Sequence, residues 1–191
     1  MLTEWIRREA RVLGPEFLQV DGFLNHCIAP RFIEEAGTAL AEAFGEETVT
    51  RVLTAEAAGN VIAFEKARRL GVTALYAKKG KALTMQRPLV RTVVSPTRGT
   101  QTDLTVSADY LGREDRVLIV DDFLFEGETS AALAEIAAEA GATLVGFGFV
   151  ISKEFAAGRA RLAGFGVPIV SLVPIASMDP ATGWIRFTDE S

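Results

Sequence analysis

Two adjacent carboxylates at the end of an aliphatic run are the residues of this sequence best suited to chemistry. Asp121 and Asp122 follow four aliphatic residues at 117–120 and precede a short loop that contains Gly127. A continuous aliphatic run of this kind is typical of a strand that is buried on both faces of a sheet. Like charges placed side by side at the end of such a strand are costly unless ligand hydroxyl groups or a hydrated cation satisfy them. The pair therefore indicates a ligand site.

The loop after the two acids has the properties of a phosphate-binding turn. Gly127 lets the backbone approach a ligand closely, and Thr129 supplies a hydroxyl donor. The loop then enters an expected helix, whose free N–H groups and dipole favour an anion at its start. We expect a sugar phosphate here, with its diol on Asp121 and Asp122 and its phosphate on the loop. The simpler alternative is a parallel strand that ends in aspartate before an ordinary glycine-containing loop.

Other common nucleotide and catalytic motifs are missing from the sequence. No G-x-G-x-x-G follows an expected strand, and no G-x-x-x-x-G-K-[ST] occurs. His26 is the single histidine and Cys27 the single cysteine. These counts exclude histidine-dependent serine or cysteine triads, multi-histidine metal sites and intrachain disulfides. We expect His26 to be structural and Cys27 to pack as a small hydrophobic residue.

Helices and strands are expected to alternate along the chain. Apolar periodicity and glycine or proline punctuation predict helices at residues 2–13, 32–44, 59–70 and 155–163, and one that ends at residue 140. Strands are expected at residues 17–20, 48–54, 72–77, 89–94, 102–107, 117–120, 143–151 and 167–172. This alternation indicates an α/β fold with a mostly parallel central sheet flanked by helices. The ligand site then lies at the carboxyl ends of the strands.

Length and composition bound the class of protein. A length of 191 residues is typical of one domain, so we expect a single domain over residues 1–191. Lys and Arg number 20 and Asp and Glu 25, and the resulting net charge of −5 argues against nucleic acid as a partner. The longest apolar run, at residues 144–151, is too short to span a membrane, and charged residues interrupt the N-terminal segment. We expect a cytoplasmic protein.

One segment is basic although the chain as a whole is acidic. Its six basic residues lie between the expected strand at 72–77 and the loop before the strand at 102–107, and they are Lys78, Lys79, Lys81, Arg87, Arg91 and Arg98. Such a segment either contacts a polyanionic ligand or forms a solvated loop. The anionic ligand expected at the acids favours the first interpretation.

Two stretches of the chain resemble a known family. Residues 117–129 (VLIVDDFLFEGET) resemble the phosphoribosyl-pyrophosphate signature of type I phosphoribosyltransferases. Residues 17–30 (FLQVDGFLNHCIAP) resemble the N-terminal base-recognition region of bacterial xanthine phosphoribosyltransferases. The segments TAEAAGNV, GVTALYAKK, DDFLFEG and FGFVISKEF match the rest of that family in order, so the resemblance covers essentially the whole chain. It implies the type I phosphoribosyltransferase fold, with a small hood built from residues 1–45.

The resemblance also implies a role for each matching position. It places the ribose diol on the catalytic acids Asp121 and Asp122. It places the 5-phosphate of the activated sugar on Phe125, Glu126, Gly127, Glu128 and Thr129. Base recognition falls to Leu18, Asn25 and Lys153. The pyrophosphate loop and the lid match Ala58, Gly59, Lys78, Lys79 and Lys81.

The proposed base-binding residues also have ordinary structural interpretations. Lys153 fits a ligand role, in which its ammonium donates to a purine oxygen, and also a solvent-facing lysine after a strand. Asn25 suits the edge of a diketo purine but also the cap of a turn. Leu18 either contacts the base or fills the core of the hood.

The phosphate loop departs from the family pattern. Family members carry small or hydroxylated residues there, whereas this loop contains Phe125, Glu126 and Glu128. A carboxylate pointing inward would repel a bound phosphate by about 1 kcal/mol at surface-like screening. We therefore expect both glutamate side chains to point outward and the backbone N–H groups to bind the phosphate.

The resemblance implies transfer of the 5-phosphoribosyl group from phosphoribosyl pyrophosphate (PRPP) to xanthine, with xanthosine 5′-monophosphate and pyrophosphate as products. It also implies Mg²⁺ bound mainly through the substrate's oxygens, and a homodimer without a membrane partner. Two alternatives stay open, namely a phosphoribosyltransferase for guanine, hypoxanthine or adenine, and a non-catalytic regulator that senses PRPP. A phosphoacceptor receiver domain fits less well because a phosphate loop directly follows the acids.

Overall fold

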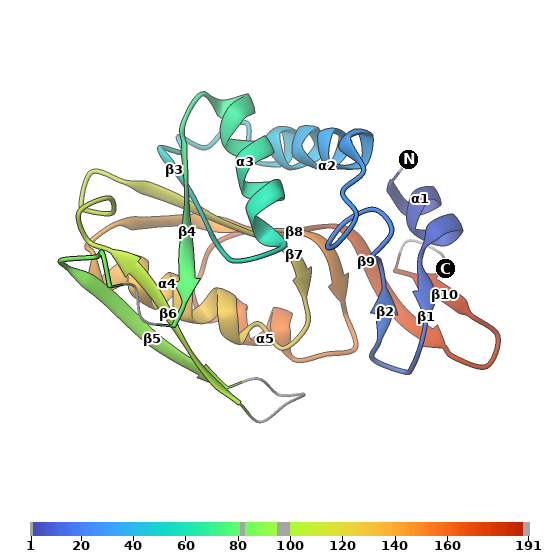
Figure 1. Cartoon of the computed structure of the whole chain (residues 1–191). Helices are drawn as coiled ribbons and strands as arrows, with labels where there is room; N and C mark the ends of the chain where they lie inside the picture. The colour runs from blue at the N-terminus through green and yellow to red at the C-terminus, as the bar shows by residue number, and fades with distance from the viewer. Residues whose placement is uncertain (1, 81–82, 95–99, 189–191) are drawn as a thin grey trace.

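The computed structural model describes residues 2–80, 83–94 and 100–188, which form a mostly parallel sheet flanked by helices (Figure 1). Its helices are α1 (Leu2–Glu9), α2 (Pro30–Ala43), α3 (Gly59–Leu70), α4 (Glu128–Glu139) and α5 (Gly158–Ala163). The eight-stranded sheet contains β3 (Arg51–Ala55), β4 (Thr73–Lys79), β5 (Pro88–Val94), β6 (Gln101–Ser107), β7 (Arg116–Leu124), β8 (Thr143–Lys153), β9 (Ile169–Asp179) and β10 (Trp184–Phe187). A separate antiparallel pair contains β1 (Arg11–Val12) and β2 (Leu18–Gln19).

The large sheet is parallel at its centre and antiparallel at both edges. Its order is β10-β9-β8-β7-β3-β4-β6-β5, and the five strands from β9 to β4 run parallel. The chain leaves β3 toward β4 on one side and leaves β7 toward β8 on the other. The strand order therefore reverses between β3 and β7. In open α/β sheets, ligands bind at such a reversal, beyond the carboxyl ends of the strands.

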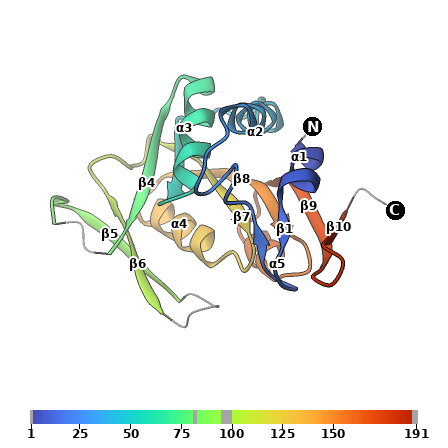
Figure 2. The ribbon, with the colours of Figure 1, turned by 45° about the vertical axis from the view of Figure 1, so that its right-hand side comes forward.

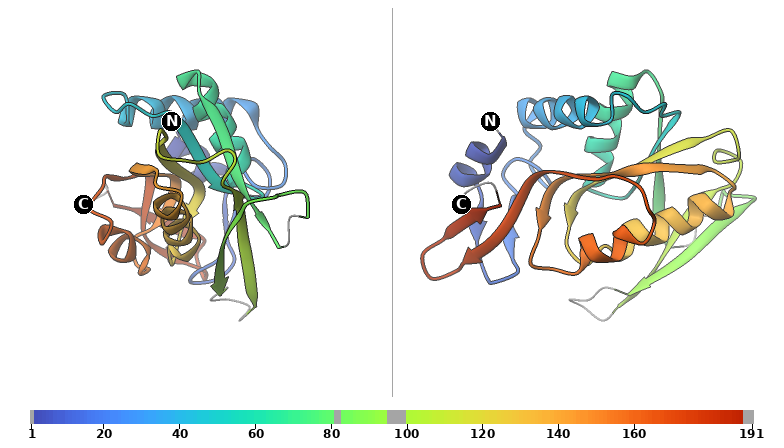
Figure 3. Two further views of the ribbon diagram at one scale, coloured as in Figure 1. Left: turned by 90° about the vertical axis from the view of Figure 1, so that its left-hand side faces the viewer. Right: turned by 180° about the vertical axis from the view of Figure 1, so that it is seen from behind.

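Helices cover both faces of the sheet (Figures 1 and 3). The side chains of β7 contribute to the hydrophobic core on each face. Leu118 and Val120 belong to the cluster under α2 and α3, whereas Val117 and Ile119 belong to the cluster under α4 and α5. All four side chains are completely buried. The aliphatic run is thus a strand enclosed on both faces, as the sequence predicts.

Glycine and proline set the bounds of two helices. α3 covers the predicted residues 59–70 and ends at Gly71, whose φ of 68° is left-handed and therefore favours glycine. α2 begins at Pro30, in the first turn, where the N–H that proline lacks would have no helical partner. Both helices therefore begin and end close to where local sequence signals place them.

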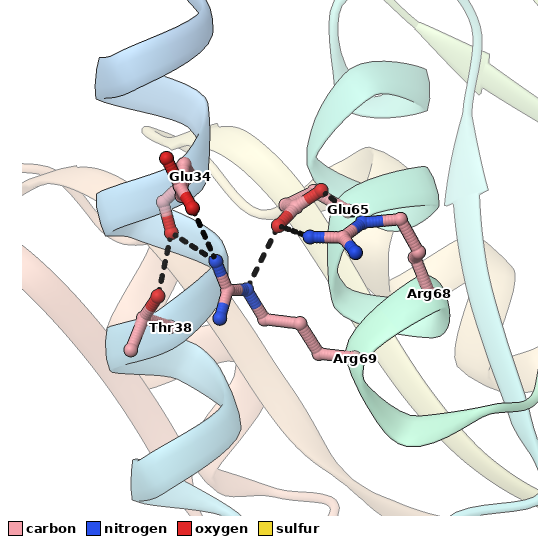
Figure 4. Close-up of polar contacts among 5 residues, drawn as sticks. All are labelled: Glu34, Thr38, Glu65, Arg68 and Arg69. Carbon is pink, nitrogen blue, oxygen red and sulfur yellow. Dashed lines mark hydrogen bonds and ion pairs between the residues drawn. The ribbon is translucent and has the colours of Figure 1, made fainter.

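An ion-pair network joins α2 and α3 beside a close helix contact (Figure 4). Glu65 accepts hydrogen bonds of 2.8 Å from both Arg68 and Arg69, and Arg69 also donates to the backbone oxygen of Glu34 over 3.3 Å. The hydrogen bond from Arg68 is the main cause that lowers the pKa of Glu65. A Cβ atom at Gly37 would lie only 2.4 Å from Cγ of Glu65. Glycine at this position therefore allows the two helices to approach.

The part of the expected hood that precedes α2, residues 2–29, stands beside β9 and β10 and is called the hood from here on (Figure 2). The hood shares its core with α2, because the rings of Trp5 and Phe23 pack edge-to-face on Phe32 at centroid distances of 5.7 and 4.8 Å. The guanidinium of Arg7 lies 5.1 Å from the ring centroid of Phe187 in β10. These contacts attach the N-terminal segment to the far end of the chain.

Several expectations about the elements need correction. The helix expected at residues 2–13 ends at Glu9, because Arg11 and Val12 pair with β2 instead. The strand expected to end at residue 120 continues to Leu124, and β10 was not anticipated. Cys27 is exposed rather than packed. Among the described residues, no helix is both long and apolar enough to cross a bilayer.

Candidate active site

Asp121 and Asp122 lie where β7 separates from β3. The ladder between β3 and β7 ends at the pair Leu53 and Ile119, whereas the pairing of β7 with β8 continues as far as Leu124. The two acids are therefore inside the strand rather than after it. They stand at the reversal in strand order, which is the place where the topology predicts a ligand site.

Burial raises the pKa of both acids. For Asp121 burial is the largest cause, the charge of Asp122 adds to it, and the pKa lies well above its usual value. Burial also raises the pKa of Asp122, against opposing hydrogen bonds from Asp121 and from the Phe123 N–H. The Asp122 N–H donates to Oδ1 of Asp121, and the Phe123 N–H donates to Oδ1 of Asp122, each over 3.0 Å. The remaining oxygen capacity suits hydroxyl donors or a cation.

The loop between β3 and α3 approaches these acids closely. A Cβ atom at Gly59 would lie 2.6 Å from Oδ1 of Asp121 and 2.1 Å from Oγ1 of Thr54. The backbone N–H of Lys79 donates to Oε1 of Glu56 over 2.6 Å, which ties the end of β4 to this loop. The loop that contains the expected pyrophosphate residues Ala58 and Gly59 is therefore adjacent both to Asp121 and to Lys79 at the end of β4.

The expected phosphate loop lines a cavity of about 280 Å³ together with Asp121 and Lys79. The loop residues on its wall are Phe125, Glu126, Gly127, Glu128 and Thr129. Gly127 precedes α4 with a φ of 74°, and a Cβ atom there would lie 3.1 Å from the backbone of Gly158. Both a left-handed φ and this close backbone contact favour glycine at position 127.

Arg161 contacts both glutamates of this loop, Glu126 through its backbone and Glu128 through its side chain. Arg161 of α5 donates through Nε to the backbone oxygen of Glu126 over 2.6 Å. Its guanidinium also lies 3.5 Å from Oε1 of Glu128. Oε2 of Glu128 is buried without a hydrogen-bond partner among the described residues. Glu128 therefore does not point outward into solvent as expected, because the residue lines the cavity and its carboxylate contacts Arg161 of α5.

Lys153 connects the hood to the phosphate loop. Its Nζ donates to the backbone oxygen of Glu16 and lies 4.8 Å from the ring centroid of Phe125 and 5.3 Å from that of Phe123. Burial lowers the pKa of the lysine, and the charge of Glu16 opposes this effect. Lys153 is therefore a half-buried ammonium with specific partners, which removes the interpretation as a solvent-facing lysine.

The other predicted site residues are more dispersed. Leu18 is half-buried in β2, and Asn25 is exposed in the hood. Lys78 lines a second cavity with Tyr76 and Tyr110, apart from the cavity at the phosphate loop. Lys81 lies outside the described residues.

The β5–β6 hairpin contributes to the cavity wall, which was not expected from the sequence. The hairpin residues on that wall are Val93, Val94, Thr102 and Leu104. Alternation along β5 and β6 identifies them as strand residues, but no local pattern shows that the hairpin folds over the end of β7. Two arginines of the basic segment are also held elsewhere, since Arg87 pairs with Asp109 over 3.3 Å and Arg91 pairs with Glu139 of α4 over 2.6 Å.

The reversed strand order, the paired acids and the glycine-containing loop that starts a helix together define a type I phosphoribosyltransferase. Solved structures agree with this class. Adenine phosphoribosyltransferase from Rhodothermus marinus is 25% identical with a TM-score of 0.75, and the match covers 91% of this chain and 98% of that one. The enzyme from Thermoanaerobacter pseudethanolicus is 26% identical with a TM-score of 0.74, over 91% and 99% of the two chains.

Sequence relatives narrow the class further, although no family model matches the chain. Xanthine phosphoribosyltransferase from Brevibacillus brevis is 44% identical over 190 residues, or 99% of this chain and 96% of the relative. The protein of that name from Moorella thermoacetica is 43% identical over 188 residues (98% and 95%), and that from Deinococcus deserti is 42% identical over 179 residues (93% and 93%). The chain belongs to the xanthine phosphoribosyltransferase family.

Proposed function

We propose that this protein transfers the 5-phosphoribosyl group from PRPP to xanthine in purine salvage, giving xanthosine 5′-monophosphate and pyrophosphate. One observation carries the proposal beyond family membership. Asp121 and the loop at residues 125–129 line the same cavity at the reversal in strand order. A pentose with a 5-phosphate spans this combination of hydroxyl acceptors and an anion-binding helix start.

In this proposal the activated sugar lies along the end of β7. Asp121 and Asp122 accept hydrogen bonds from the ribose hydroxyls, and the N–H groups of residues 125–129 bind the 5-phosphate. The start of α4 adds a favourable dipole for that phosphate. The pyrophosphate lies toward Ala58 and Gly59, with Lys79 on the cavity wall as a cation, and adjacency of Gly59 to Asp121 supports this direction.

The base lies between the sugar and the hood. Xanthine presents two keto oxygens, and Lys153 offers them an ammonium donor at the carboxyl end of β8. The lysine already reaches the hood through the carbonyl of Glu16. Asn25 supplies an amide for the polar edge of the base, and Leu18 supplies apolar surface. The hood therefore selects the heterocycle in this proposal.

The chemistry needs positioning rather than a covalent nucleophile. As the bond between C1 and the pyrophosphate lengthens, the sugar gains oxocarbenium character, as in other glycosyl transfers. The carboxylates of Asp121 and Asp122 lie near the developing positive charge and hold the ring for attack by a purine nitrogen. The β5–β6 hairpin on the cavity wall limits access of water, which would otherwise hydrolyse the activated sugar.

The site fits a magnesium ion that is bound partly by the phosphate groups of the substrate. Mg²⁺ is commonly bound by one or two carboxylates together with waters and substrate phosphates. Asp121 and Asp122 are an adjacent pair whose burial disfavours their charge, so a cation nearby would be favourable. Within the ranges that the structure describes, no group of three or more acidic, histidine or cysteine side chains could cage a metal alone. The ion would neutralise charge on the pyrophosphate.

We also propose that the active form is a homodimer of this single domain, as the family resemblance implies. Phe64 of α3, Tyr76 of β4 and Tyr110 are 65%, 43% and 66% exposed, although each is a large aromatic residue. Light scattering coupled to gel filtration tests the proposal. If the wild type is a dimer and Phe64→Glu makes it a monomer, the result supports a dimer interface at these exposed aromatic residues. A monomeric wild type would contradict the proposed homodimer.

A pyrophosphate-release assay across four purines tests the function. With PRPP and Mg²⁺ present, xanthine should give the highest kcat/KM among xanthine, guanine, hypoxanthine and adenine. A clear preference for another purine would support the alternative activity within the same class. Binding of PRPP without pyrophosphate release on any purine would support the non-catalytic regulator instead.

A further inference from the structure

The phosphate loop is held from behind by α5, through contacts that the proposed reaction does not use. The N–H of Gly158 donates to the backbone oxygen of Phe125 over 2.8 Å. Nε of Arg161 donates to the backbone oxygen of Glu126 over 2.6 Å. Two successive carbonyls of the loop therefore point toward α5.

The direction of these carbonyls determines the direction of the next N–H groups. In a trans peptide the C=O and the following N–H point in opposite directions, and the only cis peptide among the described residues joins Glu56 and Ala57. The N–H groups of Glu126 and Gly127 consequently point away from α5. The cavity wall comes from the β4, β5, β6 and β7 strands, the loop and the start of α4, with no described residue of α5. Glu126 and Gly127 themselves line this cavity, so N–H groups that point away from α5 are available to a ligand bound in it.

Arg161 also lies beside the carboxylate of Glu128, a negative charge that is unfavourable in a phosphate site. Glu128 lines the cavity at the first residue of α4, where a bound phosphate would meet its carboxylate. Its Oε1 lies 3.5 Å from the Arg161 guanidinium, and its Oε2 is buried without a hydrogen-bond partner in the part of the chain that the structure describes. A carboxylate in this setting needs a nearby cation if a second anion is to bind beside it.

We infer that Arg161 is a positioning residue for the phosphate loop. It holds the Glu126 carbonyl toward α5, so that the Gly127 N–H faces the ligand. It also compensates the charge of Glu128, so that the loop accepts a phosphate dianion despite its own carboxylates. The inference rests on the proposed function, because it assigns a role within the 5-phosphate site of that function.

The variants Arg161→Gln, Glu128→Gln and the double variant separate the two contributions of Arg161, which are holding the Glu126 carbonyl and compensating the charge of Glu128. Arg161→Gln should raise the KM for PRPP about fivefold to tenfold, because the uncompensated Glu128 repels the phosphate. Its KM for xanthine and its kcat should change by less than about twofold, since the base site and the acids are untouched. In the double variant the KM for PRPP should return to within about threefold of wild type, because the charge that needed compensation is gone.

Arg116 offers a closely matched control. It also donates to a backbone oxygen, that of Thr48 over 2.7 Å, and lies 3.4 Å from a carboxylate oxygen of Glu47. It differs in standing at the opposite end of β7 from the acids. Arg116→Gln should lower the melting temperature about as much as Arg161→Gln does, while leaving the KM for PRPP unchanged.

Binding of ribose 5-phosphate, measured by calorimetry, examines the loop independently of turnover. The Arg161→Gln variant should bind it about fivefold more weakly than wild type. If wild type binds ribose 5-phosphate but forms no nucleotide, the proposed function fails while this measurement still decides the inference. Unchanged affinity for ribose 5-phosphate and an unchanged KM for PRPP in Arg161→Gln would overturn the inference. A raised KM that the double variant does not lower would overturn the role in charge compensation.

Discussion

Gly59 at the start of α3 and Asp121 in β7 approach so closely that a Cβ atom on the glycine would lie 2.6 Å from Oδ1 of the acid. The same atom would lie 2.1 Å from Oγ1 of Thr54. This contact joins the loop proposed for pyrophosphate to the acid proposed for the ribose diol. A side chain at residue 59 must therefore displace the side chains of Thr54 and Asp121 or shift the loop itself.

The first prediction follows from this contact. Gly59→Ala should destabilise the protein by about 1–3 kcal/mol through overpacking. It should also lower turnover by at least about tenfold, because the displaced Asp121 no longer holds the sugar in position. Thermal melting and pyrophosphate release measure the two effects. Gly112→Ala is the matched control, since a Cβ atom there meets nothing within 4 Å, and normal activity of Gly59→Ala would contradict the proposed geometry.

The second prediction concerns the raised pKa of Asp121. Since burial raises its folded-state pKa above the unfolded value, the folded state binds more protons between the two values, and stability falls as pH rises through that range. Asp121→Asn should remove this fall, so the variant should be more stable than wild type at neutral pH. Its turnover should nevertheless drop roughly 100-fold, because the developing positive charge loses a carboxylate.

Urea unfolding from pH 4.5 to 8, combined with the turnover assay, checks this prediction. Asp179→Asn is a control in which the effect of pH on stability should have the opposite sign. Hydrogen bonds from Thr182 and Ala181 lower the pKa of Asp179, whereas the pKa of Asp121 is raised. That variant should lose stability above the usual pKa of aspartate. Near-normal turnover of Asp121→Asn would refute the assigned role of this acid.

The third prediction concerns Lys66, a completely buried lysine on α3. Its Nζ donates to the backbone oxygen of Leu40 over 2.9 Å, and burial lowers its pKa from 10.5 to about 8. The unfolded chain therefore binds more protons between pH 8 and 10.5, so this lysine makes stability rise with pH across that window.

Comparison with Lys66→Met isolates the effect. The free energy of unfolding of wild type relative to Lys66→Met should increase by about 3 kcal/mol from pH 7 to 10.5. Chemical denaturation of both proteins at matched pH values measures it. A constant difference across that window would show that the ammonium keeps its ordinary pKa despite its burial.

The fourth prediction concerns selection of the base. Lys153→Met should raise the KM for xanthine about 10-fold to 100-fold, the range expected for losing a hydrogen bond from a charged donor. The KM for PRPP should change little, because the lysine contacts the hood and Phe125 rather than the loop backbone. Initial-rate kinetics with each substrate varied in turn distinguish the two. An equal rise in both KM values would contradict a role specific to the base.

Local patterns in the sequence determined the elements that carry the site. The aliphatic run at residues 117–120 predicts a strand enclosed on both faces, and Gly59 and Gly71 mark the ends of α3. The strands predicted at residues 89–94 and 102–107 match β5 and β6 closely. These features are readable because the spacing of apolar residues and the backbone preferences of glycine act over a few residues.

Which of these elements come into contact depends on how the whole chain folds. The contact of Lys153 with Glu16 spans 137 positions, and that of Arg161 with Glu126 spans 35. The family resemblance identified the phosphate loop and the acids Asp121 and Asp122. The contact of Arg161 with that loop and the position of the β5–β6 hairpin on the cavity wall cannot be predicted from any local pattern. Contacts of this range depend on strand order, register and the packing of whole helices, which no short window of sequence contains.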